Sequence, residues 1–500
     1  MKRFDVLIIG SGMGGLVCAN VLAREGYRVC VVERNKQFGG CLQVYARNKV
    51  IFDAGVHYLG GLDKGQNLHQ IFKWLGVLDK LRLERMDENF DQILFDSDEK
   101  SYPIAQGYDA FIRHLVEIFP GEESAIRKYC ETIISVCDQF PMYRLRTQEA
   151  SKTEALASSA KQFIEGLTNN EKLRAVLAGN IMLYAGHGDK TPLYVHALTV
   201  NSYIESAWRC INGGSQITKA LTANIHAAGG TLLRNSEVAG LHETGGRISH
   251  VLLKDGTTIE ADHFISNTTP ANTYRLTNSR FIRPATRNRL EQETQTVSSF
   301  VLNIVFKPNC FPYVKHNYYY HKAGTLWNMQ DYKSGDWPLG YAIYLSSSSH
   351  TKEFADGMTI FAYMRYEEVE PWSAAFNTVA HPGDRGEGYV AFKKQRAEQL
   401  LNRIEEKFPG IRNCIKTYYA ATPLSYRDYI GNDDGNLYGV EKDYRTPMAS
   451  LISPRTRIPN LYLTGQSLNL HGILGTAISG LITASALTGK NDFIEKIRNA

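Results

Sequence analysis

Residues 4–15 read FDVLIIGSGMGG, a short apolar run that leads directly into a glycine-rich turn. The run is rich in β-branched side chains, which is typical of a strand buried on both faces. The turn matches the pattern G-x-G-x-x-G at Gly10, Gly12 and Gly15, and the apolar spacing after it predicts a helix that ends at Gly26. Strand, turn and helix in this order predict the first unit of a nucleotide-binding α/β fold.

The glycines of this turn have separate physical roles in binding a dinucleotide. Gly10 permits the tight turn, Gly12 lets the backbone approach a pyrophosphate, and Gly15 lets the helix pack closely on the strand. The free N–H groups at the start of the helix, around Met13 and Gly14, would face the phosphates with the help of the helix dipole. The predicted ligand of this turn is therefore a dinucleotide pyrophosphate.

A second predicted strand, residues 29–32, ends in Glu33-Arg34, 23 residues after Gly10. A carboxylate at this distance accepts hydrogen bonds from ribose hydroxyls. Six residues after Glu33 comes the run Gly39-Gly40-Cys41. The segment from Glu33 to Gly40 resembles the extended dinucleotide motif of the amine-oxidase and phytoene-desaturase superfamily, in which the glycine pair lets the chain pass close to FAD.

The resemblance implies FAD bound non-covalently, with Arg34 and Cys41 beside it. Cys41 also suggests a covalent link to the flavin, but the superfamily's non-covalent binding argues against that alternative. No second glycine loop in the sequence stands between a strand and a helix, so no stable NAD(P) domain is expected. Electrons would come from a transiently bound NAD(P)H, another protein, a quinone or oxygen, unless the flavin acts without net redox change.

Two further segments resemble one branch of this superfamily. Residues 53–61, DAGVHYLGG, resemble the D-x-G-x-H-Y-x-G element of the carotenoid isomerase and retinol saturase branch of the phytoene desaturase family. Residues 459–466, PNLYLTGQ, are similar to the family's last strand, which returns to the flavin at Gly465-Gln466. The helix that should open at Gly472-Ile473 would turn its amides toward the flavin and stabilise negative charge on its reduced form.

The middle of the chain completes the resemblance. A predicted helix at residues 217–228 and a hairpin-rich run ending at Asn267 are similar to the family's middle FAD segment, in which the residue at the place of Val238 contacts the adenine side through its backbone. Residues 119–123 and 422–429 also resemble the saturase and isomerase branch. The resemblance therefore covers essentially the whole chain.

The fold class implied is α/β, with a Rossmann-like FAD-binding domain of the amine-oxidase type interleaved with an α+β substrate domain. We expect residues 1–73, 207–273 and 445–500 in the FAD domain, and residues 74–206 and 274–444 in the substrate domain. The first insert should be mostly helical, since residues 108–119 carry apolar side chains at helical spacing. The second should contain strands at 297–306 and 358–366 and aromatic loops such as 318–320.

Composition excludes several other classes. The chain has 500 residues, 43% of them apolar and 21% charged, which is ordinary for a globular protein. A net charge of +5 is small and scattered, so no nucleic acid is expected as a partner. No segment approaches the ~18 apolar residues of a membrane span, and residues 6–9 are too short for the core of a signal peptide.

The eight cysteines form no C-x-x-C pair and no ligand-like cluster. Several lie in apolar runs, where a free thiol packs as a small hydrophobe. We therefore expect a cytoplasmic protein without structural disulfides and without a metal site. If the substrate is a lipid, we also expect contact with a membrane surface through an apolar patch on residues 74–206.

Five residues are candidates for catalysis. His57 and Tyr58 lie in the glycine-flanked loop that the resemblance puts beside the flavin, where His57 either donates a proton or polarises a substrate oxygen, or only packs. His471, just before the flavin-facing helix, either has a similar catalytic role or is a turn residue that binds the backbone. Arg427 and Asp428 either steer a substrate head group or form a structural ion pair.

The resemblance implies a flavoenzyme that saturates, desaturates or isomerises a C=C bond of an apolar isoprenoid such as a retinoid or carotenoid. Two other hypotheses remain open at this point. One is an amine-oxidase-like enzyme that oxidises a C–N bond. The other is a flavin-stabilised lipid-binding protein without turnover.

Overall fold

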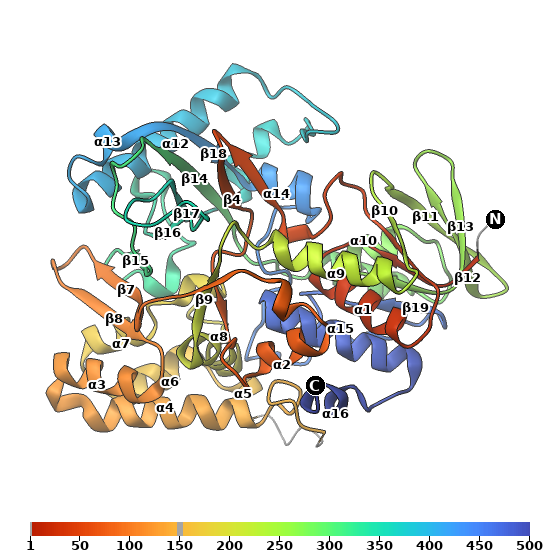
Figure 1. The fold of residues 1–500 in the computed structure, drawn as a ribbon, viewed down its shortest axis with the longest axis horizontal. Coiled ribbons are helices and arrows are strands. Elements are labelled where there is room, and N and C mark those ends of the chain that lie inside the picture. The colour runs from red at the N-terminus through yellow and green to blue at the C-terminus, as the bar shows by residue number, and fades with distance from the viewer. Residues whose placement is uncertain (1–2, 148–153) are drawn as a thin grey trace.

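The structure is a computed structural model that describes residues 3–147 and 154–500. Within these residues the strands form two sheets of seven strands, one of three and one of two. Figure 1 shows the first large sheet on one side of the molecule, the second on the other, and a group of helices from residues 108–205 below the second.

The first sheet has the order β10-β2-β1-β13-β12-β11, with β19 also paired to β13. Its strands are β1 (Arg3–Ile9), β2 (Val29–Val32), β10 (Thr231–Leu233), β11 (Val238–Thr244), β12 (Arg247–Leu253), β13 (Thr258–Ser266) and β19 (Leu461–Leu463). The pairs β10–β2, β2–β1, β1–β13 and β13–β19 are parallel. Their carboxyl ends therefore meet at one edge, where ligands bind in open α/β sheets.

Three helices cover this sheet: α1 (Met13–Arg24), α9 (Ser215–Ala227) and α15 (Gly472–Thr488) (Figure 1). Eleven of the twelve residues of α1 are buried. Glycines allow α1 and α15 to approach closely, because a Cβ added at Gly480 would lie 2.8 Å from the carbonyl oxygen of Gly14 and 2.9 Å from Cβ of Val17. This contact sets how closely the middle of α15 approaches the first turn of α1.

The second sheet has the order β18-β14-β17-β16-β15-β7-β8. Its strands are β7 (Asn89–Phe95), β8 (Ser101–Ala105), β14 (Ser298–Phe306), β15 (Asn317–His321), β16 (Gly340–Leu345), β17 (Gly357–Met364) and β18 (Ile415–Ala421). The strands expected at 297–306 and 358–366 are confirmed by β14 and β17. The expected aromatic loop at 318–320 is wrong, because these residues form the middle of β15, paired on both sides.

The remaining elements surround these sheets. The small sheets contain β3 (Val44–Arg47), β4 (Val50–Asp53), β5 (Leu59–Gly60), β6 (Leu83–Arg85) and β9 (Ala207–Cys210). The helices of the lower group are α3 (Tyr108–Ile118), α4 (Glu123–Asp138), α5 (Glu154–Ala157), α6 (Ala160–Leu167), α7 (Glu171–Leu177) and α8 (Leu193–Glu205). The others are α2 (Asn67–Trp74), α10 (Pro270–Arg275), α11 (Pro284–Gln292), α12 (Gly386–Lys407), α13 (Ile411–Cys414), α14 (Pro423–Ile430) and α16 (Phe493–Arg498).

The α/β fold class is confirmed. The insert at 74–206 is helical over α3–α8 but also contributes β6, β7 and β8. The division of the chain into two domains at the boundaries given above stays a prediction.

Two expectations about the molecule need correction. A disulfide joins Cys310 and Cys414, 104 residues apart, so the expectation of no structural disulfide is wrong. Two thiols so distant in the sequence meet because the start of β18 lies beside the end of β14, which no spacing rule reveals. Because these cysteines are paired, the cysteine content no longer supports the expectation of a reducing compartment.

The expected apolar patch on residues 74–206 is not where the exposed large apolar side chains lie. Those of the described residues are Phe354, Phe376, Val379, Val390 and Met448. The apolar side chains of α3–α8 pack instead into the main core. Within the described ranges, no helix is both long and apolar enough to cross a bilayer.

Candidate active site

A cavity of about 490 Å³ lies at the edge where the parallel strands of the first sheet end. Its volume is in the range typical of sites for small molecules and cofactors. Residues that follow β1, β2, β13 and β19 line one end, and side chains from β16 and β17 line the other. The cavity therefore extends from the first large sheet to the second.

All but one of the predicted cofactor residues line this cavity. They are Gly10, Gly12, Met13, Gly14, Glu33, Arg34, Gly39, Gly40, Cys41, Val238, Asn267, Gly465, Gln466, Gly472 and Ile473. The exception is Gly15. A Cβ there would lie 2.4 Å from the carbonyl oxygen of Gly10, so this glycine serves the packing of helix on strand.

Glu33 is buried and organises the glycine-rich turn. One carboxylate oxygen accepts hydrogen bonds from the Ser11 amide at 3.0 Å and the Ser11 hydroxyl at 2.6 Å. The other accepts one from the amide of Asn35 at 2.9 Å. The Ser11 hydroxyl in turn accepts a bond from the amide of Gly39 at 3.1 Å, which ties the glycine pair to the turn. A carboxylate accepts about four hydrogen bonds, so one acceptor site of Glu33 is left for a ligand hydroxyl.

The glycines form a cradle with no room for side chains. A Cβ at Gly12 would lie 2.7 Å from Nδ2 of Asn267, and one at Gly40 would lie 3.2 Å from Cα of Gly12. Asn267 follows β13, and its amide donates to the carbonyl of Ile9 at 2.8 Å. Its side chain therefore covers the turn beside Gly12, a contact that the glycine pattern does not reveal.

Two helices begin at the cavity without a side-chain cap. α1 begins after Gly12 and α15 after His471, and neither N-cap makes a side-chain hydrogen bond. A Cβ at Gly472 would meet nothing within 4 Å, so the space in front of α15 is open. Unsatisfied N–H groups and two helix dipoles directed at one cavity suit an anionic or electron-rich group. These residues fit the phosphates and ring of a flavin nucleotide.

Cys41 lies beside the glycine pair. Burial raises the pKa of its thiol to about 11. The thiol is therefore neutral near neutral pH and a weak nucleophile, which agrees with the expectation of a non-covalent flavin.

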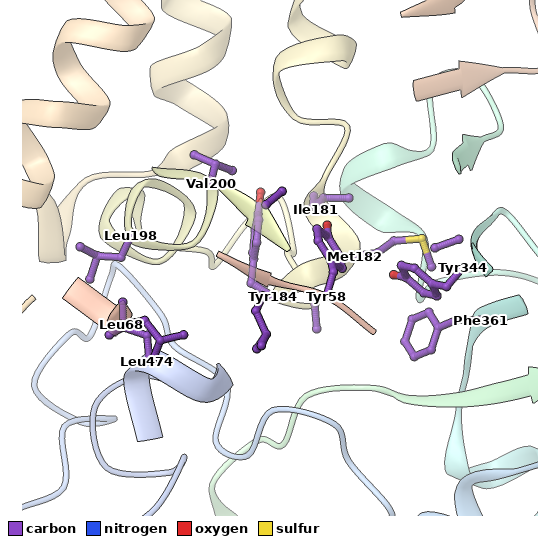
Figure 2. Packing of buried hydrophobic residues seen from close by; sticks show 14 of the residues in the cluster. Tyr58, Leu68, Ile181, Met182, Tyr184, Leu198, Val200, Tyr344, Phe361 and Leu474 are labelled. Carbon is purple, nitrogen blue, oxygen red and sulfur yellow. The ribbon is translucent and has the colours of Figure 1, made fainter. Parts of the chain in front are cut away.

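The other end of the cavity is aromatic. Its aromatic and histidine side chains come from the loop after β4, from α8 and α14, from strands β16 and β17, and from the segments before and at the start of α15. They are His57, Tyr58, Tyr203, Tyr344, Phe361, Tyr426, Tyr438 and His471. Tyr58, Tyr344 and Phe361 belong to one packed cluster of buried side chains (Figure 2). The charged residues that line the cavity, Glu33, Arg34, Glu237 and Arg275, lie on the segments around β2, β11 and α10 instead.

Both predicted histidines line the cavity as neutral rings. The ring of His57 stacks on Tyr344 with centroids 4.2 Å apart, and burial lowers its pKa to about 4. His471 contacts the ring of Tyr438 at 4.5 Å, and its Nε2 lies 3.2 Å from the carbonyl oxygen of Leu183. Burial also lowers the pKa of His471 to about 4. Neither ring carries a proton to donate as an imidazolium near neutral pH.

Arg427 and Asp428 do not line the cavity. Arg427 donates to Asp428 at 2.8 Å and to the carbonyls of Ser373 and Ala375 at 2.6 and 2.7 Å. Asp428 is fully buried and also pairs with Arg385. The structural ion pair, one of the two alternatives from the sequence, is what the structure shows. A role in steering a substrate is not supported, because both side chains hold the loop before α12 against α14.

Tyr58 lines the cavity, but its hydroxyl is held by two buried partners, Asp91 and Tyr319. Neither partner was predicted from the sequence, nor were Tyr344 and Phe361. Asp91 and Tyr319 lie on neighbouring parallel strands, β7 and β15. A tyrosine-rich run at 318–320 was the one visible signal, and nothing in it distinguishes Tyr319 from its neighbours.

Comparison with known proteins agrees with this geometry. The chain is 28% identical to the all-trans-retinol 13,14-reductase of Rattus norvegicus, over 98% of this chain and 86% of the relative. It is 23% identical to prolycopene isomerase 2, chloroplastic, of an Oncidium hybrid cultivar, over 99% of this chain and 85% of the relative.

Among solved structures, putrescine oxidase bound to putrescine superposes with a TM-score of 0.66 at 14% identity, covering 98% of this chain and all of that one. At this identity the likeness concerns the fold alone. Residues 13–488 match the family described as flavin containing amine oxidoreductase. The chain therefore belongs to the flavin-containing amine oxidoreductase family and is a flavin-dependent oxidoreductase.

Proposed function

We propose that the protein binds FAD and transfers hydrogen to or from a C=C bond of an apolar polyene of retinoid or carotenoid type. The adenosine and pyrophosphate would lie at the glycine-rich turn, with a ribose hydroxyl on Glu33. The flavin ring would lie at the start of α15, near Gly472. Bound there, FAD supplies a hydride donor or acceptor, which the side chains of the chain itself do not provide.

The observation that carries this proposal is the aromatic end of the cavity, where tyrosine and phenylalanine rings meet two neutral histidines. No charged side chain of the described residues lines this end. A flat conjugated hydrocarbon packs on such rings favourably, because its apolar surface is removed from water. The likeness to an all-trans-retinol 13,14-reductase and a prolycopene isomerase supports the same substrate class.

The protein's own groups would orient the substrate and exclude water. The stacked pair His57–Tyr344 presents one rigid wall, and Tyr438 with His471 presents another. Because both histidines are neutral, they act near neutral pH as hydrogen-bonding or packing groups rather than as cations. A polar end group of the substrate, such as a retinoid hydroxyl, would bind to one of these rings.

A polyene dissolved in a bilayer must reach this cavity from a membrane surface. We propose contact through the segment 376–390, which carries the exposed side chains Phe376, Val379 and Val390. This segment adjoins the cavity, because the amide of Val379 donates to the hydroxyl of Tyr429, one of the lining residues, at 3.0 Å.

The test is product analysis. FAD-loaded protein is reduced with dithionite under anaerobic conditions and mixed with retinoids or carotenoids, and the products are identified by mass spectrometry. A polyene product changed by two hydrogen atoms, or a geometric isomer, is the expected result. A second sample is left oxidised and is mixed with amines in air. Hydrogen peroxide release in this sample, and no change in any polyene, would instead establish C–N oxidation. Bound flavin that never changes its spectrum with either class would indicate a binding protein.

A further inference from the structure

Asp91 is a buried carboxylate in β7 that the proposed function does not use. Its side chain is not exposed at all. One oxygen accepts a hydrogen bond from Nδ2 of Asn317 at 2.8 Å, and the other accepts one from Nδ2 of Asn180 at 2.6 Å. No lysine, arginine or histidine forms an ion pair with Asp91 in the described part of the chain. A buried carboxylate without an ion pair is costly, and binding a proton lowers the cost because it neutralises the charge.

A row of three phenol hydroxyls leads from Asp91 to the cavity. The hydroxyl of Tyr58 donates to Asp91 at 3.0 Å and lies 2.7 Å from the hydroxyl of Tyr319. The hydroxyl of Tyr319 lies 3.2 Å from that of Tyr344. Tyr58 and Tyr344 line the cavity, whereas Tyr319 does not. The hydroxyl of Tyr58 is held by Asp91 and Tyr319, so the row ends at the cavity with the hydroxyl of Tyr344. Each hydroxyl both donates and accepts a hydrogen bond, so the row can reverse direction without moving a heavy atom.

We propose that this row of hydroxyls carries a proton from Asp91 to the cavity, where the hydroxyl of Tyr344 donates it to a substrate carbon. The inference rests on the proposed function and names the acid for that reaction. Tyr344 is the catalytic residue, since it lines the cavity at the end of the row. Asp91, Tyr58 and Tyr319 act through it.

The step balances in atoms and electrons. One carbon of the double bond would receive the hydride that reduced FAD supplies when bound, and the neighbouring carbon receives the proton of Tyr344. Tyr344 regains a proton from Tyr319, Tyr319 from Tyr58, and Tyr58 from Asp91, which becomes a carboxylate. The π bond is replaced by two C–H bonds, and the two electrons are those of the hydride. Water that enters the cavity after product release returns a proton to Asp91 along the same row.

The surroundings of Asp91 suit a group that exchanges protons near neutral pH. Burial raises its pKa to about 7, opposed by hydrogen bonds from its three donors and by the positive charge of Arg209. Arg209 is itself buried and reaches Asp91 through Asn317, whose Oδ1 accepts from Nη2 of Arg209 at 2.7 Å. The other titratable groups that face Asp91 are phenols: Tyr58, Tyr203, Tyr319 and Tyr344.

The first test needs neither cofactor nor substrate. It is a pH titration in an Asp53→Asn background, because burial raises the pKa of Asp53 to about 7 as well. Infrared difference spectra of this apoprotein should show a protonated carboxyl band that disappears near neutral pH and is absent when Asp91→Asn is added. In Tyr58→Phe this band should disappear at a higher pH, because the variant removes a hydrogen bond that stabilises the carboxylate of Asp91. Tyr184→Phe is the matched control, since this buried phenol bonds His196 and is not part of the row. Its band should disappear at the same pH as in the Asp53→Asn background alone.

The second test is a single turnover of the reduced holoenzyme with a polyene that the wild type converts. Tyr319→Phe removes only a hydroxyl that does not touch the substrate. We expect flavin reoxidation by the polyene to be slower by about 10²-fold, in the range of general acid catalysis. The wild-type rate should fall as pH rises through the ionisation of Asp91, and Tyr319→Phe should lose this dependence. Tyr344→Phe should be slowed at least as much.

The two proposals can fail separately. If the wild type converts no polyene, the proposed function is wrong, whatever the infrared titration shows. If the wild type converts a polyene while Tyr319→Phe and Tyr58→Phe keep its rate and its pH profile, the relay is wrong and the flavoenzyme stands. Circular dichroism checks that each variant is folded. If one is not, Asp91→Asn takes its place, and we expect the same loss of rate and of pH dependence.

Discussion

Single residues hold the nucleotide end of the cavity in place before any cofactor binds. Glu33 fastens the turn through Ser11, and Ser11 fastens the glycine pair through the amide of Gly39. Asn267 closes the turn from the side of β13. The residue that would bind the ribose is thus also the residue that positions the turn.

Glu33→Gln tests this double role. The amide keeps the shape but replaces one acceptor oxygen by a donor, and hydrogen bonds to a charged group contribute about 1.5–3 kcal/mol each. We expect FAD affinity to fall by about 10- to 150-fold, measured by titrating apoprotein and following flavin fluorescence. Glu237→Gln is the control, since this carboxylate lines the cavity but pairs with Lys254. Unchanged affinity in Glu33→Gln would assign the ribose contact to another residue.

The burial of the Asp53 carboxyl group leads us to expect that the stability of the protein depends on pH. Its carboxylate accepts a hydrogen bond from the amide of Gly214 at 2.7 Å, and burial raises its pKa to about 7. It lines a small cavity with His57 and Arg209. Because the folded-state pKa lies above the unfolded value of about 3.9, its contribution to stability is full below that value and is lost as pH rises through about 7.

In Asp53→Asn this contribution no longer varies with pH. The melting temperature of the variant minus that of the wild type should therefore rise between about pH 5 and about pH 8. Both proteins are measured as apoproteins by circular dichroism. A difference that stays constant across this range would show that Asp53 does not titrate there.

At the level of elements, the site depends on where two helices begin. α1 and α15 both start at the cavity, and their separation is set by the contact of Gly480 with Gly14 and Val17. The dipole of each helix stabilises negative charge only close to its first turn. A shift of α15 would therefore change the effect of its dipole on a group bound in the cavity. A single methyl group at the contact is enough to test the arrangement.

Gly480→Ala puts a Cβ 2.8 Å from a backbone oxygen of α1, so α15 must shift. Overpacking of this kind costs about 1–3 kcal/mol. We expect a lower melting temperature and a smaller ratio of bound flavin to protein, read from flavin absorbance. Gly166→Ala in α6 is the matched control, since its Cβ would meet nothing within 4 Å. Equal flavin content in Gly480→Ala and the wild type would contradict the role of this contact.

At the level of the whole molecule, the cavity connects two sheets, and the proposed membrane contact lies on the segment 376–390. We expect weak binding to liposomes that survives high salt, because a net charge of +5 spread over the chain supplies no dominant electrostatic anchor. Flotation at low and high salt measures it. Val379→Asp should reduce flotation and turnover of lipid-embedded polyene together. Flotation equal to that of the wild type would remove this segment from the contact.

The nucleotide end of the site could be predicted well because its signals are local. Gly10, Gly12 and Glu33 belong to one strand–turn–helix–strand unit whose order and spacing are read directly from the chain. The resemblance to a family extended this to Gly465 and Gly472, which lie far away in the sequence. Fold class and flavin dependence followed from these signals.

The sequence by itself thus determined the first parallel pair of strands, β1 and β2, the glycine-rich turn and the position of its acid, since each depends on neighbours within about thirty residues. Tertiary structure alone decided the aromatic end of the cavity and the surroundings of Asp91. Asp91, Tyr58 and Tyr319 come from three separate segments, and the register of β7 against β15 brings two of them together. The pairing of Asp428 with Arg385 and the disulfide of Cys310 depend equally on long-range packing. Burial, which moves the pKa of Asp91 and His57 in opposite directions, exists only once the chain has folded.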